Sequence, residues 1–288
     1  MKVLILGFFH NKNTEGLYKI LKFLRFDYKH LADCADFTGY DIIISPNKPL
    51  EAYKWPSKKF IFGPHFGIYP SVLPLINSID NRASNCIYIQ PSEWVSNLFT
   101  PFVINMPVKT CSFPVDSEKF KAMRVNPINT NKVMIYFKNR NPQHLTIVKE
   151  LLSKKGFEII LFDYTKRYNE NDYINTLKNI EFVCWVGRHE SQGFALQEAL
   201  FMNVPLFVWN VKLLSDEWGG KRPDVRATTL SYWDNSCGSV FNDIENIELH
   251  FDLFYTNLNK GLYQPHNFIK SCVGVDACAQ HFLKLFDS

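Results

Sequence analysis

Short apolar runs recur along the chain, with polar segments between them. Up to residue 115 they occupy residues 3–7, 41–45, 59–63 and 86–90. Runs of this length that end in small or turn residues are typical of strands buried on both faces, as in parallel sheets. Residues 16–26 repeat leucine and isoleucine at helical spacing, and Asn13 or Thr14 is expected to cap that helix. A further helix is expected to open at residues 91–94.

The same alternation restarts after a polar segment, residues 121–132, which contains Pro127 and three asparagines. Strands are predicted at residues 133–137, 158–162, 182–186 and 206–209. Helical patterns lie between them, at residues 145–155, 173–177 and 192–202. An alternation of strands and helices with short connections predicts a parallel sheet covered by helices.

Two such halves joined by a polar linker predict an α/β chain with two Rossmann-like domains, whose parallel sheets face a cleft. We place the N-terminal domain at residues 1–122 and the second domain at residues 123–270. The remaining residues, 271–288, carry an amphipathic helical pattern. Ligands of such sheets bind at the carboxyl ends of the strands, so functional residues are expected there.

The composition narrows the classes of function. Hydrophobic residues make up 46% of the 288 residues and charged residues 21%, which is typical of a globular chain with a packed core. The formal net charge of +4 is too weak to indicate nucleic-acid binding. The seven cysteines are odd in number and include no Cys-x-x-Cys, so reduced thiols are expected rather than a zinc site or a disulfide framework.

The N-terminus does not have the pattern of a targeting signal. The apolar run after Lys2 is short, and no small-residue cleavage site follows it. No stretch approaches the ~20 apolar residues that a membrane-spanning helix needs. We therefore expect a soluble, cytoplasmic protein without a transmembrane segment.

Candidate chemistry concentrates in residues 186–200, between a predicted buried strand and the helix after it. A helix start at the carboxyl end of a strand presents free backbone N–H groups to an anion such as a diphosphate. Gly193 has no side chain, so a ligand can approach the backbone there. Glu190 and Glu198 differ by about 80° around the helix axis, so both can line one side of a cleft and accept hydrogen bonds from a sugar diol. The alternative is that Glu190 only complements the helix dipole and that Glu198 is a solvated helix position.

Three stretches, in order along the chain, resemble the signature of retaining GT-B glycosyltransferases of group 1, the family 4-like type. The main stretch combines residues 189–200, which carry two glutamates separated by seven residues, with a turn at residues 203–205. Residues 90–95 and 113–120 resemble the family's Pro-Ser helix start and its Val-Asp segment before the linker. The His-Glu-Ser-Gln-Gly-Phe-Ala part of the main stretch, together with residues 232–234, is similar to compact members from large DNA viruses and phages.

The resemblance implies roles for the residues that match. The family's first glutamate contacts the donor sugar and its second holds the ribose hydroxyls, which correspond here to Glu190 and Glu198. The family also uses an Arg and a Lys after the first strand of the second domain to neutralise the diphosphate. Lys138 and Arg140 stand there in a different order and spacing, which leaves their individual roles open. His65 ends a strand of the first domain and is expected either to donate to a sugar hydroxyl or to be a structural loop histidine.

The candidate site residues form two groups. The catalytic candidates are Glu190, His65, Lys138 and Arg140. The donor-binding candidates are Glu198, Gly193, Phe194, Ala195, Leu196, Arg188, His189, Gly7 and Asn13. No Asp-x-Asp occurs and the first turn lacks Gly-x-Gly-x-x-Gly, so neither a metal site nor a dinucleotide cofactor is expected.

The resemblance implies transfer of a sugar from a nucleoside-diphosphate sugar to a hydroxyl acceptor (a glycan, a lipid or a protein glycan), with retention and without metal. The first domain would bind the acceptor and the second the donor, and the C-terminal helix would cross back onto the first domain. The rivals are a GT-B sugar-nucleotide epimerase or phosphorylase, and a non-catalytic module that binds a sugar nucleotide or glycan. The host cytoplasm is the expected location if the chain is viral.

Overall fold

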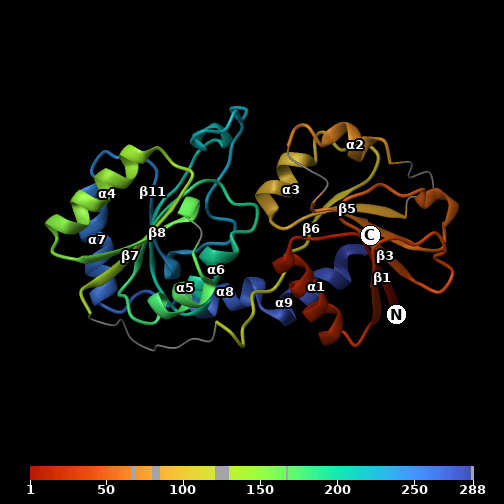
Figure 1. Ribbon diagram of the computed structural model, residues 1–288, viewed down its shortest axis with the longest axis horizontal. Helices are drawn as coiled ribbons and strands as arrows, with labels where there is room; N and C mark the ends of the chain where they lie inside the picture. Colours follow the sequence, from red (N-terminus) through yellow and green to blue (C-terminus); the bar gives the residue numbers. More distant parts are fainter. Residues whose placement is uncertain (66–68, 80–84, 121–129, 167, 287–288) are drawn as a thin grey trace. The chain divides into compact units, whose positions relative to one another are not determined.

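The computed structural model of the chain describes residues 1–65, 69–79, 85–120, 130–166 and 168–286. The chain divides into two compact units (Figure 1). Unit 1 consists of Met1–Pro114 and Val273–Ser288, and unit 2 consists of Val115–Cys272. Most of the linker predicted at residues 121–132, including the predicted boundary between 122 and 123, lies outside the described residues.

Unit 1 is built on a parallel sheet with the strand order β2-β1-β3-β4-β5-β6. The strands are β1 (Lys2–Leu6), β2 (Asp27–Leu31), β3 (Ile42–Ser45), β4 (Lys59–Phe62), β5 (Cys86–Gln90) and β6 (Val108–Thr110). The chain places β2 on one side of β1 and the later strands on the other. The pair β1 and β3 is therefore the switch point of this sheet, where ligands of such folds bind.

Helices cover both faces of the unit 1 sheet (Figure 1). They are α1 (Asn11–Phe23), α2 (Leu73–Asn77), α3 (Glu93–Phe99) and α9 (Val275–Leu283). Alternate strand residues such as Leu4 and Ile43 form one hydrophobic cluster with Val95 and Phe99 of α3. On the other side, α1 packs against α9, so the last helix of the chain belongs to the same unit as the first strand.

Unit 2 is built on a second parallel sheet, with the order β11-β10-β9-β7-β8. Its strands are β7 (Lys132–Lys138), β8 (Glu158–Asp163), β9 (Val183–Gly187), β10 (Leu206–Trp209) and β11 (Gly238–Phe241). Here the chain places β8 on one side of β7 and the later strands on the other. The pair β7 and β9 is the switch point of unit 2, and Lys138 pairs with Gly187 at its carboxyl end.

Helices also cover both faces of the unit 2 sheet. They are α4 (Pro142–Lys154), α5 (Glu170–Leu177), α6 (Phe194–Phe201), α7 (Ile247–Asn259) and α8 (Pro265–Val273). Figure 1 shows α4 and α7 on one side of the sheet and α5 and α6 on the other. Val133 and Ile135 of β7 join the core toward α4 and α7, whereas Tyr136 contacts Tyr173 of α5. Short 3-10 helices are η1 (Ala52–Lys54), η2 (Tyr164–Lys166), η3 (Leu214–Asp216), η4 (Asn235–Cys237) and η5 (Lys284–Phe286).

Every apolar run that the sequence predicts as a strand forms one, and both sheets are parallel as expected. The helix predicted at residues 16–26 begins and ends earlier, as α1. It ends at Phe23 because Arg25 adopts a left-handed φ of 56°. The N-cap is His10 rather than Asn13 or Thr14. Asn13 lies within α1 and its side chain hydrogen-bonds His65 instead.

Candidate active site

The candidate site of unit 2 lies at the switch point of its sheet, where β7 and β9 end side by side. Lys138 is the last residue of β7, and its carbonyl accepts a hydrogen bond from the N–H of Arg188 at 2.9 Å. Residues 188–193 then lead from β9 into α6. Because parallel strands end at the same sheet edge, this edge brings together residues that are about fifty positions apart in the sequence.

Gly193 shapes the entry into α6. It is the N-cap residue and adopts φ +79° and ψ 53°, a left-handed conformation that glycine reaches without a Cβ penalty. A Cβ at this position would lie 3.3 Å from the Cβ of Glu190. The first amides of α6 belong to Phe194, Ala195 and Leu196, three of the predicted donor-binding residues, and they follow directly on Gly193, whose backbone approaches Glu190. The start of a helix carries partial positive charge, which favours an anionic ligand.

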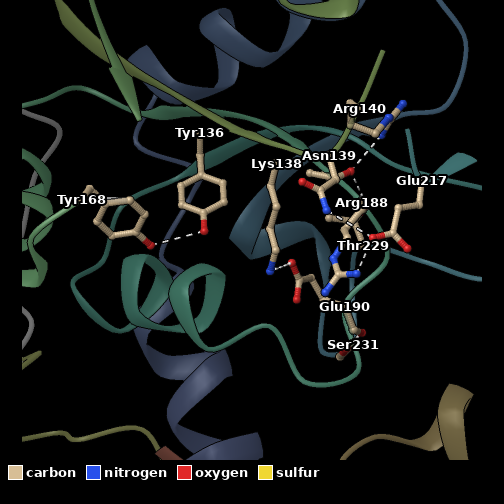
Figure 2. A network of polar contacts seen from close by, with 11 residues as sticks. Tyr136, Lys138, Asn139, Arg140, Tyr168, Arg188, Glu190, Glu217, Thr229 and Ser231 are labelled. Carbon is tan, nitrogen blue, oxygen red and sulfur yellow. Dashed lines mark hydrogen bonds and ion pairs between the residues drawn. The ribbon is translucent and has the colours of Figure 1, made fainter. Parts of the chain in front are cut away.

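Lys138 and Glu190 form a nearly buried ion pair. The Nζ of Lys138 lies 2.6 Å from Oε1 of Glu190, and the two side chains are only 10% and 12% exposed. Figure 2 shows the two side chains pointing toward each other from the end of β7 and the segment before α6. The same ammonium lies 4.4 Å from the centre of the Tyr164 ring. A buried ammonium needs a counter-charge, and Glu190 supplies it.

The backbone around Glu190 is held by the segment that precedes η4. The N–H of Glu190 donates to the carbonyl of Thr228 at 3.1 Å. The hydroxyl of Ser231 donates to the carbonyl of Glu190 at 2.7 Å. The main chain of Glu190 is thus fixed on both sides, and its carboxylate is the part that faces Lys138.

A second group of charges adjoins the first and was not predicted from the sequence. Glu217, on the loop after β10, accepts hydrogen bonds from Arg188 Nη1 at 2.5 Å, Arg222 Nε at 2.9 Å and Asn139 Nδ2 at 3.2 Å. Burial by itself would raise the pKa of Glu217, but the hydrogen bond from Arg222 and the charge of Arg188 outweigh it and lower the pKa to about 2. Glu217 therefore fixes the position of Arg188, a predicted donor-binding residue. No periodicity or motif around residue 217 signals this contact.

Arg140 has a different environment from Lys138. It is buried, and its Nη1 donates to the carbonyls of Gly187 at 2.9 Å and Trp209 at 3.0 Å. Burial lowers the pKa of its guanidinium to about 10. In Figure 2 the Arg140 side chain points away from Lys138 and Glu190. Its observed contacts join the carboxyl ends of β9 and β10.

The remaining candidates in unit 2 are buried to different degrees. Glu198 is only 4% exposed within α6. Burial, followed by the charge of Glu198, raises the pKa of Tyr173, whose hydroxyl donates to the carbonyl of Ala195 at 2.6 Å. His189 is half-buried, and burial together with the charge of Arg188 lowers its pKa to about 4, so its imidazole is neutral at pH 7. Residues 232–234 are only partly covered; Asp234 caps η4 by accepting the N–H of Ser236 at 2.8 Å.

Three candidates belong to unit 1. Gly7 follows β1 with φ +76°, and a Cβ there would lie 2.7 Å from Oδ1 of Asn47. The side chain of Asn13, in α1, hydrogen-bonds Nε2 of His65 at 2.9 Å. The rings of His10 and His65 stack with their centres 6.1 Å apart. Burial, together with the nearby His10, lowers the pKa of His65. The switch point of unit 1 thus carries a cluster of imidazole and amide groups.

A metal site would need several ligating side chains close together. Within the described part of the chain, no group of three or more His, Cys, Asp or Glu side chains could hold a metal ion. Within the same residues, no helix has both the length and the apolar character needed to cross a bilayer.

Comparison with known proteins identifies the fold. No protein-family model matches the sequence, and the search of curated proteins finds no match. Among solved structures, a glycosyltransferase from Rickettsia africae ESF-5 is similar with a TM-score of 0.65 and 11% identity, covering 100% of this chain and 99% of that one. Sucrose-phosphate synthase from Thermosynechococcus elongatus is similar with a TM-score of 0.59 and 8% identity, covering 99% and 98%.

The chain has the GT-B fold. Two units, each with its own parallel sheet, match these glycosyltransferase structures over almost the whole length of both chains. The predicted fold class, two α/β domains that each contain a parallel sheet, is therefore confirmed. At 8–11% identity the likeness establishes the fold alone, so the activity has to be argued from the side chains at the switch points.

Proposed function

We propose that this protein is a glycosyltransferase that moves a sugar from a nucleoside-diphosphate sugar to a hydroxyl acceptor. The observation that carries the proposal is the buried Lys138–Glu190 ion pair beside the first amides of α6, at the switch point of unit 2. One position thus combines a cation and helix amides for phosphate with a carboxylate for sugar hydroxyls. The fold is consistent with the proposal, because the similar structures include a glycosyltransferase and a sucrose-phosphate synthase.

The proposed reaction makes and breaks one bond to the anomeric carbon. The bond from that carbon to the β-phosphate oxygen breaks, and its electron pair leaves with the nucleoside diphosphate. The oxygen of the acceptor hydroxyl bonds to the anomeric carbon, and its proton passes to the departing phosphate. The negative charge that develops on the phosphate is the main catalytic demand, and Lys138 and the amides of Phe194 and Ala195 are the groups proposed to stabilise it.

Specific residues are proposed to hold the two ends of the donor. Glu190 would accept hydrogen bonds from the sugar hydroxyls and Glu198 from the ribose. Arg188, fixed by Glu217, would provide a second positive charge near the phosphates. We also propose retention of the anomeric configuration, transfer without a metal ion, and a glycan, lipid or protein glycan as the acceptor. The His65 and Asn13 pair of unit 1 is the proposed contact for the acceptor hydroxyl.

The first experiment identifies the donor. Purified protein is heated with UDP, GDP, ADP or TDP sugars, and a bound ligand raises the melting temperature according to its concentration relative to Kd. The active donor is then incubated with and without acceptors. Conversion of the sugar nucleotide into its epimer without any acceptor would indicate an epimerase, and tight binding without turnover would indicate a binding module.

The second experiment tests Glu190. The Glu190→Ala variant is expected to lose transfer, by about a hundredfold or more in kcat/KM, while its circular dichroism spectrum stays unchanged. Glu248→Ala is a matched control, because Glu248 forms an exposed ion pair with Lys154 in the same unit. Turnover of the Glu190→Ala variant at the wild-type rate would refute the assignment.

A further inference from the structure

The Lys138–Glu190 pair joins the two groups that the proposed function assigns to different parts of the donor. In the structure, the ammonium proposed to hold phosphate is paired at 2.6 Å with the carboxylate proposed to hold sugar. We infer that Glu190 is a specificity-determining residue that makes the site bind the intact sugar nucleotide in preference to the sugar-free diphosphate, by occupying Lys138. The inference rests on the proposed function and extends it to discrimination between substrate and product.

Burial makes the competition strong. Both side chains are about nine-tenths covered, so water screens their attraction weakly. A bare diphosphate that approaches Lys138 has to displace a carboxylate and then lie beside that carboxylate's negative charge. An intact donor brings hydroxyl groups as well, and a hydroxyl donates a hydrogen bond to a carboxylate. An intact donor therefore offers hydrogen bonds to Glu190 when phosphate takes over Lys138, whereas a bare diphosphate, which lacks the donor sugar, adds only negative charge.

The surroundings keep Glu190 in this position. The N–H and the carbonyl of Glu190 are both hydrogen-bonded to the segment at residues 228–231. Gly193, which has no side chain, leaves room for the Cβ of Glu190. The ammonium also lies 4.4 Å from the centre of the Tyr164 ring, which carries no charge that could replace Glu190. The main chain of Glu190 is thus restrained. When a ligand binds, Glu190 therefore changes its partner by movement of its carboxylate rather than of its backbone.

The neighbouring arginines cannot replace Lys138 in this role. Arg188 is paired with Glu217, whose side chain is 5% exposed and is also bonded to Arg222. Arg140 donates to two backbone carbonyls. Among the described residues at this edge of the sheet, Lys138 is therefore the cation that a phosphate can take over, and Glu190 is the group that competes for it.

Inorganic pyrophosphate is a suitable probe because it has the charge of the diphosphate and neither base nor sugar. Its Kd is measured by titration calorimetry for the wild type, Glu190→Gln, Lys138→Met, the double variant and Glu248→Gln. Removing the charge of Glu190 is expected to tighten pyrophosphate binding by about tenfold or more. Lys138→Met is expected to weaken pyrophosphate binding. The decrease in Kd that Glu190→Gln causes is expected to be at least about threefold smaller when Lys138 is also replaced by Met. Glu248→Gln removes an equal charge from an exposed ion pair in the same unit and is expected to leave the Kd of pyrophosphate unchanged.

A second measurement uses the donor found by the melting screen and its own nucleoside diphosphate. The ratio of their Kd values is expected to favour the intact donor in the wild type and to fall by about tenfold or more in Glu190→Gln. Pyrophosphate binding that is no tighter in Glu190→Gln, or that is not detectable in any variant, overturns the inference. If transfer is found but Glu190→Gln leaves the ratio unchanged, the inference fails and the proposed function stands. If no sugar is transferred but Glu190→Gln still tightens pyrophosphate binding in a way that depends on Lys138, the proposed function fails. Control of anion binding at Lys138 by Glu190 then stands.

Discussion

Replacing Glu217 by Gln removes the negative charge that Arg188 and Arg222 share. Glu217 is the centre of the second charged group, and it is buried while its two arginine partners are 28% and 24% exposed. The glutamine keeps the shape of the side chain and can still accept a hydrogen bond. The substitution therefore isolates the contribution of the charge from that of packing.

The pKa of Glu217 gives the size of the effect. Its fall from an ordinary 4.5 to about 2 means that the folded state favours the charged carboxylate. At 1.36 kcal/mol per pKa unit, the charge contributes about 3 kcal/mol to the free energy of unfolding at pH 7. Because the folded-state pKa is the lower one, this contribution is present above pH 4.5 and disappears as the pH falls toward 2. At pH 3.5 about 2 kcal/mol should remain.

Urea denaturation followed by tryptophan fluorescence measures this difference between the wild type and Glu217→Gln. The variant is expected to be less stable by about 3 kcal/mol at pH 7, with the gap narrowing by about 1 kcal/mol at pH 3.5. Glu248→Gln serves as the control, since an exposed ion pair contributes about 0–1 kcal/mol. A gap that is below 1 kcal/mol at pH 7, or that widens on acidification, would refute the electrostatic account of Glu217.

Two further substitutions test the geometry of the site. Gly193→Ala and Gly156→Ala should each lower the free energy of unfolding by about 1 kcal/mol, because both glycines have positive φ. Only Gly193→Ala should also reduce transfer, by about tenfold, because its methyl group would press on Glu190 whereas position 156 is open; equal activity of the two variants would contradict this. Arg140→Leu is expected to lower the free energy of unfolding by about 2–3 kcal/mol, since two buried strand-end carbonyls lose their donor. A loss below 1 kcal/mol in urea denaturation would show that these contacts do not stabilise the sheet.

The sequence predicts the interior strands of both sheets well, and the edges less well. β5 and β10 lie inside their sheets and are apolar along nearly their whole length, so each appears as a continuous run of apolar residues. β2 forms an edge of the unit 1 sheet, and its residues Asp27–Leu31 are mostly polar and exposed. β6, at the other edge, has only three residues, all half-buried. β2 and β6 lack the double burial that produces a recognisable run, so hydropathy does not identify them, whereas the edge strand β8 has an apolar run and is predicted.

The sequence also identifies only some residues of the candidate site. Lys138 and Glu190 are recognisable from the sequence because Lys138 ends a strand with a clear apolar pattern and Glu190 follows another within three residues. Asn139, Glu217 and Arg222 are not, because Glu217 and Arg222 come from an irregular loop and meet Asn139 only through the tertiary fold. For Arg140 the sequence indicates a charge at a strand end but not its direction. The direction depends on which backbone carbonyls lack a donor once β9 and β10 are aligned.

The return of α9 to unit 1 affects the order in which the chain can fold. The helix buries Cys278, Ala279 and Phe282 in a unit whose strands all precede residue 115. During translation the whole of Val115–Cys272 leaves the ribosome before α9 does, so unit 2 can complete its sheet while the earlier unit still lacks a helix. Until residue 283 emerges, the surface of α1 that receives α9 stays uncovered. Of the two units, the one that is synthesised first is therefore finished last, and a nascent chain that stalls between unit 2 and α9 would leave the surface of α1 that receives α9 exposed.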